Sequence, residues 1–447
     1  MDPINEYRGV LTINALFDEE LMATVNCTTP YCANQLLSIV VQPSDVALDP
    51  FDDADADLKT SSDLGKEFLD ALSTYVDGVF AIQQRTFFIM LLVMGRRCRV
   101  LRWDRAGVAT TVAFDYISRW RFFCDILWRT SVLARHAPDR LGLDPTATRI
   151  FPGDFLWQLM EEEARAHHDD PEAEERDLED GELPTGVFTW AYVRRFFADS
   201  LDDMWPRYAL KVPDESSYAD TDGFRRFLVC KPRYIHDGLV GGGTRGYVAL
   251  DVSTRRFRWL KDTWRAEDAG FRKEGDILAK LDTKCVEYAP TMICHGDLPD
   301  QMTHSSALRT ANSFVGSTST DFTPTESTPK QKREEDPGHS RCGEDVCHGW
   351  AASNSPVRLR KCTTGRPYYL RQHYRLVVAE VCMPFDMLIS GAHLLQVIYN
   401  CISGAFSALA LLVIVFFLLF VNGRPIPRST LYRLAQSEDP PPQDQDR

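Results

Sequence analysis

The sequence predicts an α+β fold, with an N-terminal portion of strands and helices, a second antiparallel sheet and one C-terminal transmembrane helix. Short apolar runs between glycine-containing or charged turns indicate antiparallel strands. Longer segments carry apolar residues three or four positions apart, which is the spacing of amphipathic helices. Near the C-terminus, residues 405–421 contain no charged side chain, and this run is long enough to indicate a membrane span.

Length, charge and cysteine usage limit the class of protein. The chain has 447 residues, a net charge of −14 and 12 cysteines. This length allows two or three domains. An acidic balance argues against a nucleic-acid partner, because phosphates would repel it. The cysteines lack paired spacing, which favours a reducing compartment over a disulfide framework. The first residues lack the basic and apolar pattern of a signal peptide.

The first half of the chain predicts a weakly structured start followed by a strand meander and helices. Residues 1–65 show little periodicity and include an Asp-rich stretch, so we expect a weakly structured N-terminal region. Within residues 66–210, alternating apolar side chains predict an antiparallel meander over residues 85–114. Helical periodicity predicts helices over residues 64–80, 117–133 and 189–205, the second with an apolar stripe of Trp120, Phe123, Leu127 and Trp128.

Two features of this half have alternative interpretations. Residues 102–105 (Arg-Trp-Asp-Arg) lie at a predicted hairpin end. One interpretation is an ion pair that stabilises the turn, and the other is a set of side chains that bind a ligand. We favour the turn. Residues 161–182 are rich in acidic side chains, which repel one another and favour a solvated loop. His167 and His168 lie inside this segment, so a metal site is the alternative there.

A glycine-rich turn organises the rest of the chain. It fits the pattern G-x-G-x-x-G-x-V, with fixed positions at Gly241, Gly243, Gly246 and Val248. Glycines permit a tight loop whose backbone N–H groups face phosphate oxygens, and Val248 on the following strand would cover a purine ring. An ordinary hairpin is the alternative. A Rossmann turn is disfavoured, because residues 247–251 continue as a strand rather than a helix.

A lysine and a glutamate complete a nucleotide-binding pattern. Lys261 ends a predicted strand of alternating large apolar residues, from which its ammonium group would reach the α- and β-phosphates. Glu274 begins a helical segment and would pair with Lys261. Glu267 is the competing partner, and a solvated helix face is the alternative for Glu274. Turn, strand lysine and helix glutamate follow one another in this order in a protein-kinase small lobe.

With these motifs, the sequence resembles the fungal-type protein kinase (FunK) family over most of residues 66–402. The residues that carry the resemblance are 99–108 with 114–116 and 141–146, the glycine-rich turn with 261–265 and Glu274, and 374–381. The resemblance implies a Ser/Thr kinase that transfers the γ-phosphate of ATP to protein. It implies a kinase-like small lobe in residues 211–298. It also implies a hinge and a large-lobe stub in residues 368–403, where Glu380 and Cys382 would offer backbone groups to adenine.

The chain departs from the family where the catalytic loop and metal-binding residues should follow the hinge. His295-Gly296-Asp297 is only superficially similar to the catalytic motif, since it precedes the hinge and lacks the arginine. Met302 stands where an asparagine is needed. We therefore expect a pseudokinase, with weak or vestigial ATP binding and no magnesium site. An active kinase is one alternative; a non-catalytic, membrane-tethered scaffold with protein partners, or a truncated gene-model product, is the other.

The C-terminal part of the sequence predicts disorder and a membrane anchor. Residues 299–367 are rich in Ser, Thr, Pro and charge, so we expect a disordered insertion. Residues 404–422 contain the apolar run and predict a transmembrane helix, followed by a disordered tail over residues 423–447. Near the apolar run, Arg424, Arg428 and Arg433 favour a cytosolic tail by the positive-inside rule. Because the body resembles a cytosolic nucleotide-binding fold, we nevertheless expect a single-pass membrane protein with a cytosolic body.

Overall fold

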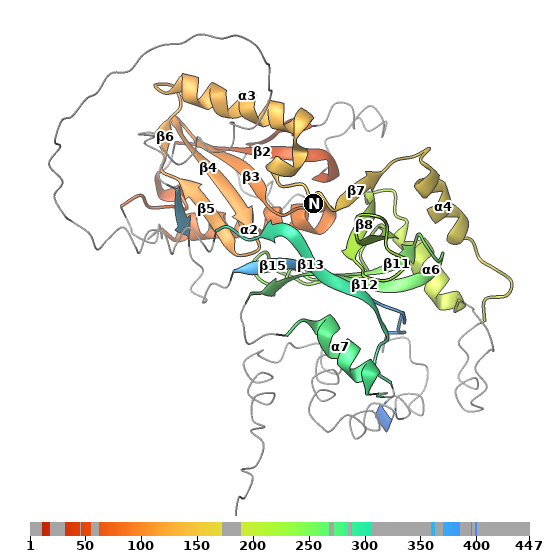
Figure 1. Cartoon of the computed structure of the whole chain (residues 1–447). Helices are drawn as coiled ribbons and strands as arrows, with labels where there is room; N and C mark the ends of the chain where they lie inside the picture. Colours follow the sequence, from red (N-terminus) through yellow and green to blue (C-terminus); the bar gives the residue numbers. More distant parts are fainter. Residues whose placement is uncertain are drawn as a thin grey trace, which may run out of the picture.

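The computed structural model has an α+β fold in which two sheets lie side by side, with helices on their faces (Figure 1). It describes residues 11–17, 32–44, 46–54, 62–171, 189–267, 272–284, 286, 288–305, 359–362, 370–384, 395 and 398–399. The five α-helices of this described part are α2 (Asp63–Ile82), α3 (Trp120–His136), α4 (Phe155–Glu163), α6 (Ala191–Ser200) and α7 (Glu274–Thr283). The α+β class expected from the sequence is confirmed.

The first sheet is built mainly from the N-terminal part of the chain. In spatial order its strands are β1 (Leu11–Phe17), β2 (Gln35–Gln42), β3 (Phe88–Met94), β4 (Arg97–Asp104), β5 (Gly107–Thr111) and β14 (Leu359–Cys362), with β6 (Phe114–Asp115) paired to β4. β2 and β3 are parallel, and the other pairs are antiparallel. The meander expected over residues 85–114 is confirmed as β3, β4 and β5. The short 3-10 helices are η2 (Cys32–Asn34), η3 (Val46–Leu48) and η4 (Pro138–Leu141).

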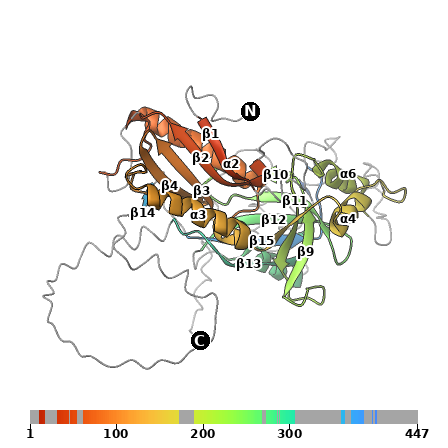
Figure 2. The same cartoon turned by 90° about the horizontal axis from the view of Figure 1, so that it is seen from above.

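Helices α2 and α3 cover opposite faces of the first sheet. α2 starts at Ser62, whose side chain accepts a hydrogen bond from the backbone N–H of Gly65 and so caps the helix. Its apolar side packs on β3 and β4 in one buried cluster. α3 lies across the other face (Figure 2). Its Phe122 and Phe123 are partly buried there. Trp120 is 57% exposed and Trp128 is 63% exposed, so the expected stripe was wrong about these two residues.

The second sheet is antiparallel throughout. In spatial order its strands are β13 (Met292–Met302), β15 (Arg371–Val378), β12 (Phe257–Ala266), β11 (Arg245–Asp251), β9 (Phe224–Val229), β8 (Arg207–Pro213) and β7 (Ala147–Ile150), with β10 (Tyr234–Ile235) paired to β11. The sheet extends beyond the expected small lobe of residues 211–298, because β7 and most of β8 come from the preceding portion. The strand pairing therefore joins two regions that the sequence suggested were separate.

The second sheet curls, and its two faces have different neighbours. On the inner face, Tyr208 and Leu210 of β8 pack with Cys294 of β13 and Val377 of β15. On the outer face, α4 and α6 pack against β11 and β12 in one buried cluster. α7 packs on the same outer face, over β12 and β15. Lys261 lies on this face as well, because strand residues two positions apart point the same way and Trp259 belongs to both outer-face clusters.

Some expected boundaries differ from the structure or fall outside what it describes. β2 belongs to residues 1–65, yet it is largely buried between β1 and β3 because its apolar residues complete the first sheet. β13 reaches Met302 and β14 covers residues 359–362, so both enter the segment that we expected to be disordered. In the described part of the chain, no helix is long and apolar enough to cross a bilayer. The expected transmembrane helix at residues 404–422 and the tail lie outside the described residues.

Candidate functional site

The structure brings together Lys261 and Glu274, the two charged residues that the sequence singled out. Lys261 extends from β12 and Glu274 is the first residue of α7. The Nζ atom of Lys261 lies 2.5 Å from Oε2 of Glu274, so the expected ion pair is confirmed. Glu274, rather than the competing Glu267, is the partner. Both side chains are about one-third exposed, at 32% and 38%.

The glycine-rich turn is in contact with the first sheet. The backbone N–H of Gly241 donates to the carbonyl of Arg105, which follows β4, with an N···O distance of 3.1 Å. A Cβ atom on Gly243 would lie 2.4 Å from Nε of Arg105, and φ at Gly243 is +48°. Glycine is therefore required at this position for backbone conformation and for the close approach of an arginine side chain. This turn is a joint between the two sheets.

Arg105 holds this joint from the side of the first sheet. Its Nη1 atom donates to Oδ1 of Asp77 on α2 at 3.1 Å and to the carbonyl of Leu239 at 3.3 Å. The guanidinium group lies over the ring of Phe80, 4.8 Å from its centroid. Burial lowers the pKa of Arg105 to about 10. Asp77 also accepts a hydrogen bond from the backbone N–H of Gly238, so its carboxylate binds both Arg105 and the segment that precedes the glycine-rich turn.

Asp104, next to Arg105, stabilises the turn between β4 and β5, which is the role that we favoured for residues 102–105. The carboxylate is fully buried and accepts hydrogen bonds from Nη1 of Arg102 and from the backbone N–H of Ala106, both at 2.9 Å. It also accepts from the backbone N–H groups of His304 and Ser305, which follow β13. The turn between β4 and β5 is thereby attached to the end of the second sheet.

Arg245, an intervening residue of the glycine pattern, secures the same turn from inside. Its Nη1 atom donates to the carbonyl of Phe80 at 3.1 Å and to the carbonyl of Gln83 at 3.0 Å, near the C-terminal end of α2. Its Nη2 atom pairs with Oδ2 of Asp262 on β12. All of these groups are removed from solvent, so Arg245 is not available to a phosphate.

The face that would hold adenine is covered by α6. Val248 is only 3% exposed and packs in the outer-face cluster with Tyr192 and Phe196 of α6. The hydroxyl of Tyr192 donates to the carbonyl of Val381 at 2.7 Å. Val381 lies between Glu380 and Cys382, in the stretch expected to offer backbone groups to adenine. A side chain of the protein therefore already uses one backbone acceptor of that stretch.

Trp259 further fills this face, and our sequence reasoning missed it. It lies two residues before Lys261, where the kinase motif V-A-I-K has an alanine. A Cβ atom on Gly246 would lie 2.4 Å from Cζ2 of Trp259, so the indole rests directly on this glycine. The signal was present in the sequence as Arg-Trp-Leu-Lys at residues 258–261. The large ring narrows the space next to Lys261.

Near the hinge, Glu380 and Cys382 are placed as the chain order suggested, beyond the end of β15. The carboxylate of Glu380 accepts a hydrogen bond from the backbone N–H of Thr291 at 2.8 Å, which ties this stretch to the start of β13. Cys382 is exposed. Their backbone roles toward adenine stay a prediction.

Asp297 of the His-Gly-Asp triplet is engaged by two cations. Its Oδ1 and Oδ2 atoms accept from Nε and Nη2 of Arg265 at 2.6 and 2.7 Å, and Oδ2 lies 2.9 Å from Nζ of Lys273. Burial alone would raise the pKa of Asp297, but the hydrogen bonds from Arg265 and Lys273 hold this pKa below its usual value. The carboxylate is ionised and held in place, which does not suit a base that must reach a substrate hydroxyl.

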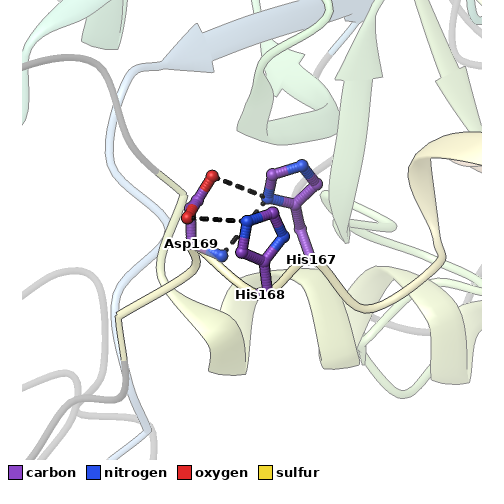
Figure 3. A group of neighbouring side chains, drawn as sticks. All are labelled: His167, His168 and Asp169. Carbon is purple, nitrogen blue, oxygen red and sulfur yellow. Dashed lines mark hydrogen bonds and ion pairs between the residues drawn. The ribbon is translucent and has the colours of Figure 1, made fainter.

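His167, His168 and Asp169 form a surface group just beyond α4 (Figure 3). Nε2 of His168 lies 3.1 Å from Oδ1 of Asp169, and the two imidazole rings are stacked 4.8 Å apart. All three residues are consecutive and exposed. They are the only group of at least three such side chains with metal-ligand geometry among the described residues. We assign them no metal, because no buried donor orients the rings.

Comparison with known proteins gives one match. A family model described as fungal protein kinase matches residues 53–172 and 213–412. The two matched segments contain the first sheet from β3 to β5, the glycine-rich turn, the Lys261–Glu274 pair and the hinge stretch. No curated protein and no solved structure matches the chain.

Proposed function

Because the chain belongs to the fungal protein kinase family, we propose that its second sheet and α7 form a kinase-like module that binds ATP weakly and does not transfer its γ-phosphate. The observation that carries the proposal is the ion pair between Lys261 and Glu274 at 2.5 Å. In protein kinases, a strand lysine paired with a helix glutamate contacts the α- and β-phosphates. A lysine oriented in this way and one-third exposed gives the triphosphate a fixed cationic contact.

The surroundings of Lys261 favour weak binding. In a kinase, Gly241, Gly243 and Gly246 would face phosphates and Val248 would cover the purine ring. Here the turn contacts Arg105 and Val248 is buried under α6. The binding free energy gained from one phosphate contact is therefore offset by the free energy needed to displace the side chains that pack on the glycine-rich turn and on Val248. Glu380 and Cys382 would supply backbone groups to adenine only after this displacement.

Absence of phosphotransfer is the second part of the proposal. The transfer needs an aspartate that accepts the substrate proton and acids that hold magnesium. The His-Gly-Asp sequence at residues 295–297, on this face, has its carboxylate bound to Arg265 and Lys273. We propose that the module acts through protein partners, as a scaffold. Tethering by residues 405–421, with the body in the cytosol, is a further prediction, and we expect no nucleic-acid partner.

Calorimetric titration of ATP into the full-length chain tests nucleotide binding. We expect a Kd of about 1 mM, which corresponds to about 4 kcal/mol. Lys261→Met should weaken binding at least about tenfold, since a hydrogen bond to a charged group contributes about 1.5–3 kcal/mol. Lys231→Met is the matched control, because Lys231 pairs with Asp202 on another part of the surface. Equal affinity of the wild type and Lys261→Met would disprove the phosphate contact.

Radiolabelled ATP tests the absence of transfer. We expect no label on a basic protein substrate or on the chain itself, with or without magnesium. Transfer that is lost in Asp297→Asn would show that this aspartate is a catalytic base after all. Transfer that persists in that variant would show that another residue serves as the base.

A further inference from the structure

The His-Gly-Asp triplet of β13 lies directly under the first turn of α7. Successive strand side chains point to opposite faces of a sheet. His295 is paired in register with Leu376 and Asp297 with Tyr374 on β15. His295 and Asp297 therefore point to the outer face, where α7 packs on Leu376 and Tyr374. Gly296, between them, points to the inner face.

Asp297 connects the start of α7 to β12. Lys273 is the residue immediately before α7, in the N-cap position, and it has no capping side-chain hydrogen bond. Its Nζ atom lies 2.9 Å from Oδ2 of Asp297, while Arg265 of β12 holds both carboxylate oxygens. The aspartate thus fixes the residue that precedes Glu274 against the strand that carries Lys261.

His295 and Tyr374 fix the residues that follow Glu274. The backbone N–H of Gly275 donates to the hydroxyl of Tyr374 at 2.9 Å. A Cβ atom on Gly275 would lie 2.1 Å from Cγ of His295, so the imidazole lies against the helix backbone. Nε2 of His295 is also 3.6 Å from Oδ1 of Asp276. The first turn of α7 is therefore in contact with the sheet on both sides of Glu274.

Gly296 has its own packing role. A Cβ atom at this position would lie 2.7 Å from both Cβ and Cγ of Pro213, at the end of β8. The glycine lets β8 close over the inner face of the sheet. Each residue of the triplet thus has a geometric function, although the triplet lacks the features of a catalytic loop.

We propose that Asp297 and His295 are positioning residues for the Lys261–Glu274 pair. A glycine in the first turn of a helix weakens that turn, because glycine has a low helix propensity. The first turn of α7 contains Gly275, so its geometry depends on the contacts from β13 and β15. Asp297 and His295 hold Glu274 where its carboxylate meets Lys261. As far as ATP binding is concerned, this inference rests on the proposed function.

A ligand-free measurement tests the positioning directly. An amine-reactive ester, followed by mass spectrometry, reports the acylation rate of Nζ of Lys261 in the full-length chain. Asp297→Asn keeps the size of the side chain and removes its charge. We expect the acylation rate of Lys261 to rise about fivefold, because the carboxylate of Glu274 is then no longer held against the ammonium group. Asp222→Asn is the matched control, since Asp222 forms an exposed pair with Lys211 and should leave Lys261 unchanged.

ATP titrations add a readout that a purely structural role would not move. Asp297→Asn should weaken ATP binding about fivefold in the wild-type background and should have no effect in the Lys261→Met background, because residues that act as a unit are not additive. Equal weakening in both backgrounds would overturn the proposal, as would an unchanged acylation rate in a folded Asp297→Asn variant.

Two further variants keep the test decisive. If Asp297→Asn does not fold, Arg265→Lys keeps the positive charge beside Asp297 but loses the two-point contact with its carboxylate, and an acylation rate between those of wild type and Glu274→Gln is expected. Unchanged acylation in Arg265→Lys would count against the role of Asp297. If the wild type binds no ATP, the proposed function fails, and the acylation rates still decide whether Asp297 positions the ion pair.

Discussion

Tyr192→Phe should strengthen ATP binding. The ring of Tyr192 packs in the outer-face cluster and its hydroxyl donates to the carbonyl of Val381 at 2.7 Å. Burial raises the pKa of Tyr192 to about 12, so the hydroxyl is protonated and donates at neutral pH. Phenylalanine keeps the ring and its packing while it releases this carbonyl. The hinge backbone then has a free acceptor for the amino group of adenine.

The expected size of the effect follows from one neutral hydrogen bond. Such a bond contributes about 1 kcal/mol net, and leaving its acceptor unpaired costs a similar amount. The free energy of unfolding should fall by about 1 kcal/mol, since only one hydroxyl is lost. ATP affinity should rise by up to about fivefold, because the nucleotide no longer competes with Tyr192 for Val381.

Calorimetric titration of ATP and urea unfolding of the same protein give both quantities. Tyr75→Phe is the control, because the hydroxyl of Tyr75 donates to Oε1 of Gln35 beneath the first sheet, away from Val381. This variant should lose similar stability and keep the wild-type affinity for ATP. An unchanged or lower affinity in Tyr192→Phe would refute the idea that α6 competes with adenine.

Two further predictions concern stability. Asp104→Ala should lower the free energy of unfolding by about 3–5 kcal/mol in urea, because it removes a fully buried carboxylate, the partner of the half-buried Arg102, and leaves the backbone N–H groups of His304 and Ser305 without an acceptor. A loss below about 1 kcal/mol would contradict the joint between the sheets. Burial lowers the pKa of His295 and of His304 below 6.5, so the unfolded chain binds more protons just below that pH. Stability should therefore fall as pH drops through 6.5, and replacing both histidines with asparagine should flatten this decline.

Local patterns were sufficient for the parts of the site that lie close together in the chain. Lys261 and Glu274 are 13 residues apart and pair as expected, because one strand and the following helix are enough to bring them together. The meander of β3, β4 and β5 likewise follows from alternating apolar residues joined by short turns. The periodicity of α3 indicated a helix, but it did not show which face would be buried.

The sequence by itself determined the order of turn, lysine and glutamate and the α+β class, because these depend on neighbouring residues. Only the tertiary structure decided what the glycines contact. Beside the glycine-rich turn, the guanidinium group of Arg105 donates to the carbonyl of Leu239, 134 residues along the chain. The hydroxyl of Tyr192 donates to the carbonyl of Val381, 189 residues along the chain. No periodicity encodes such distant contacts, since they arise when the two sheets and α6 pack together. Gly243 and Gly246, which would fit a phosphate-binding loop, therefore allow the close approach of Arg105 and Trp259 here.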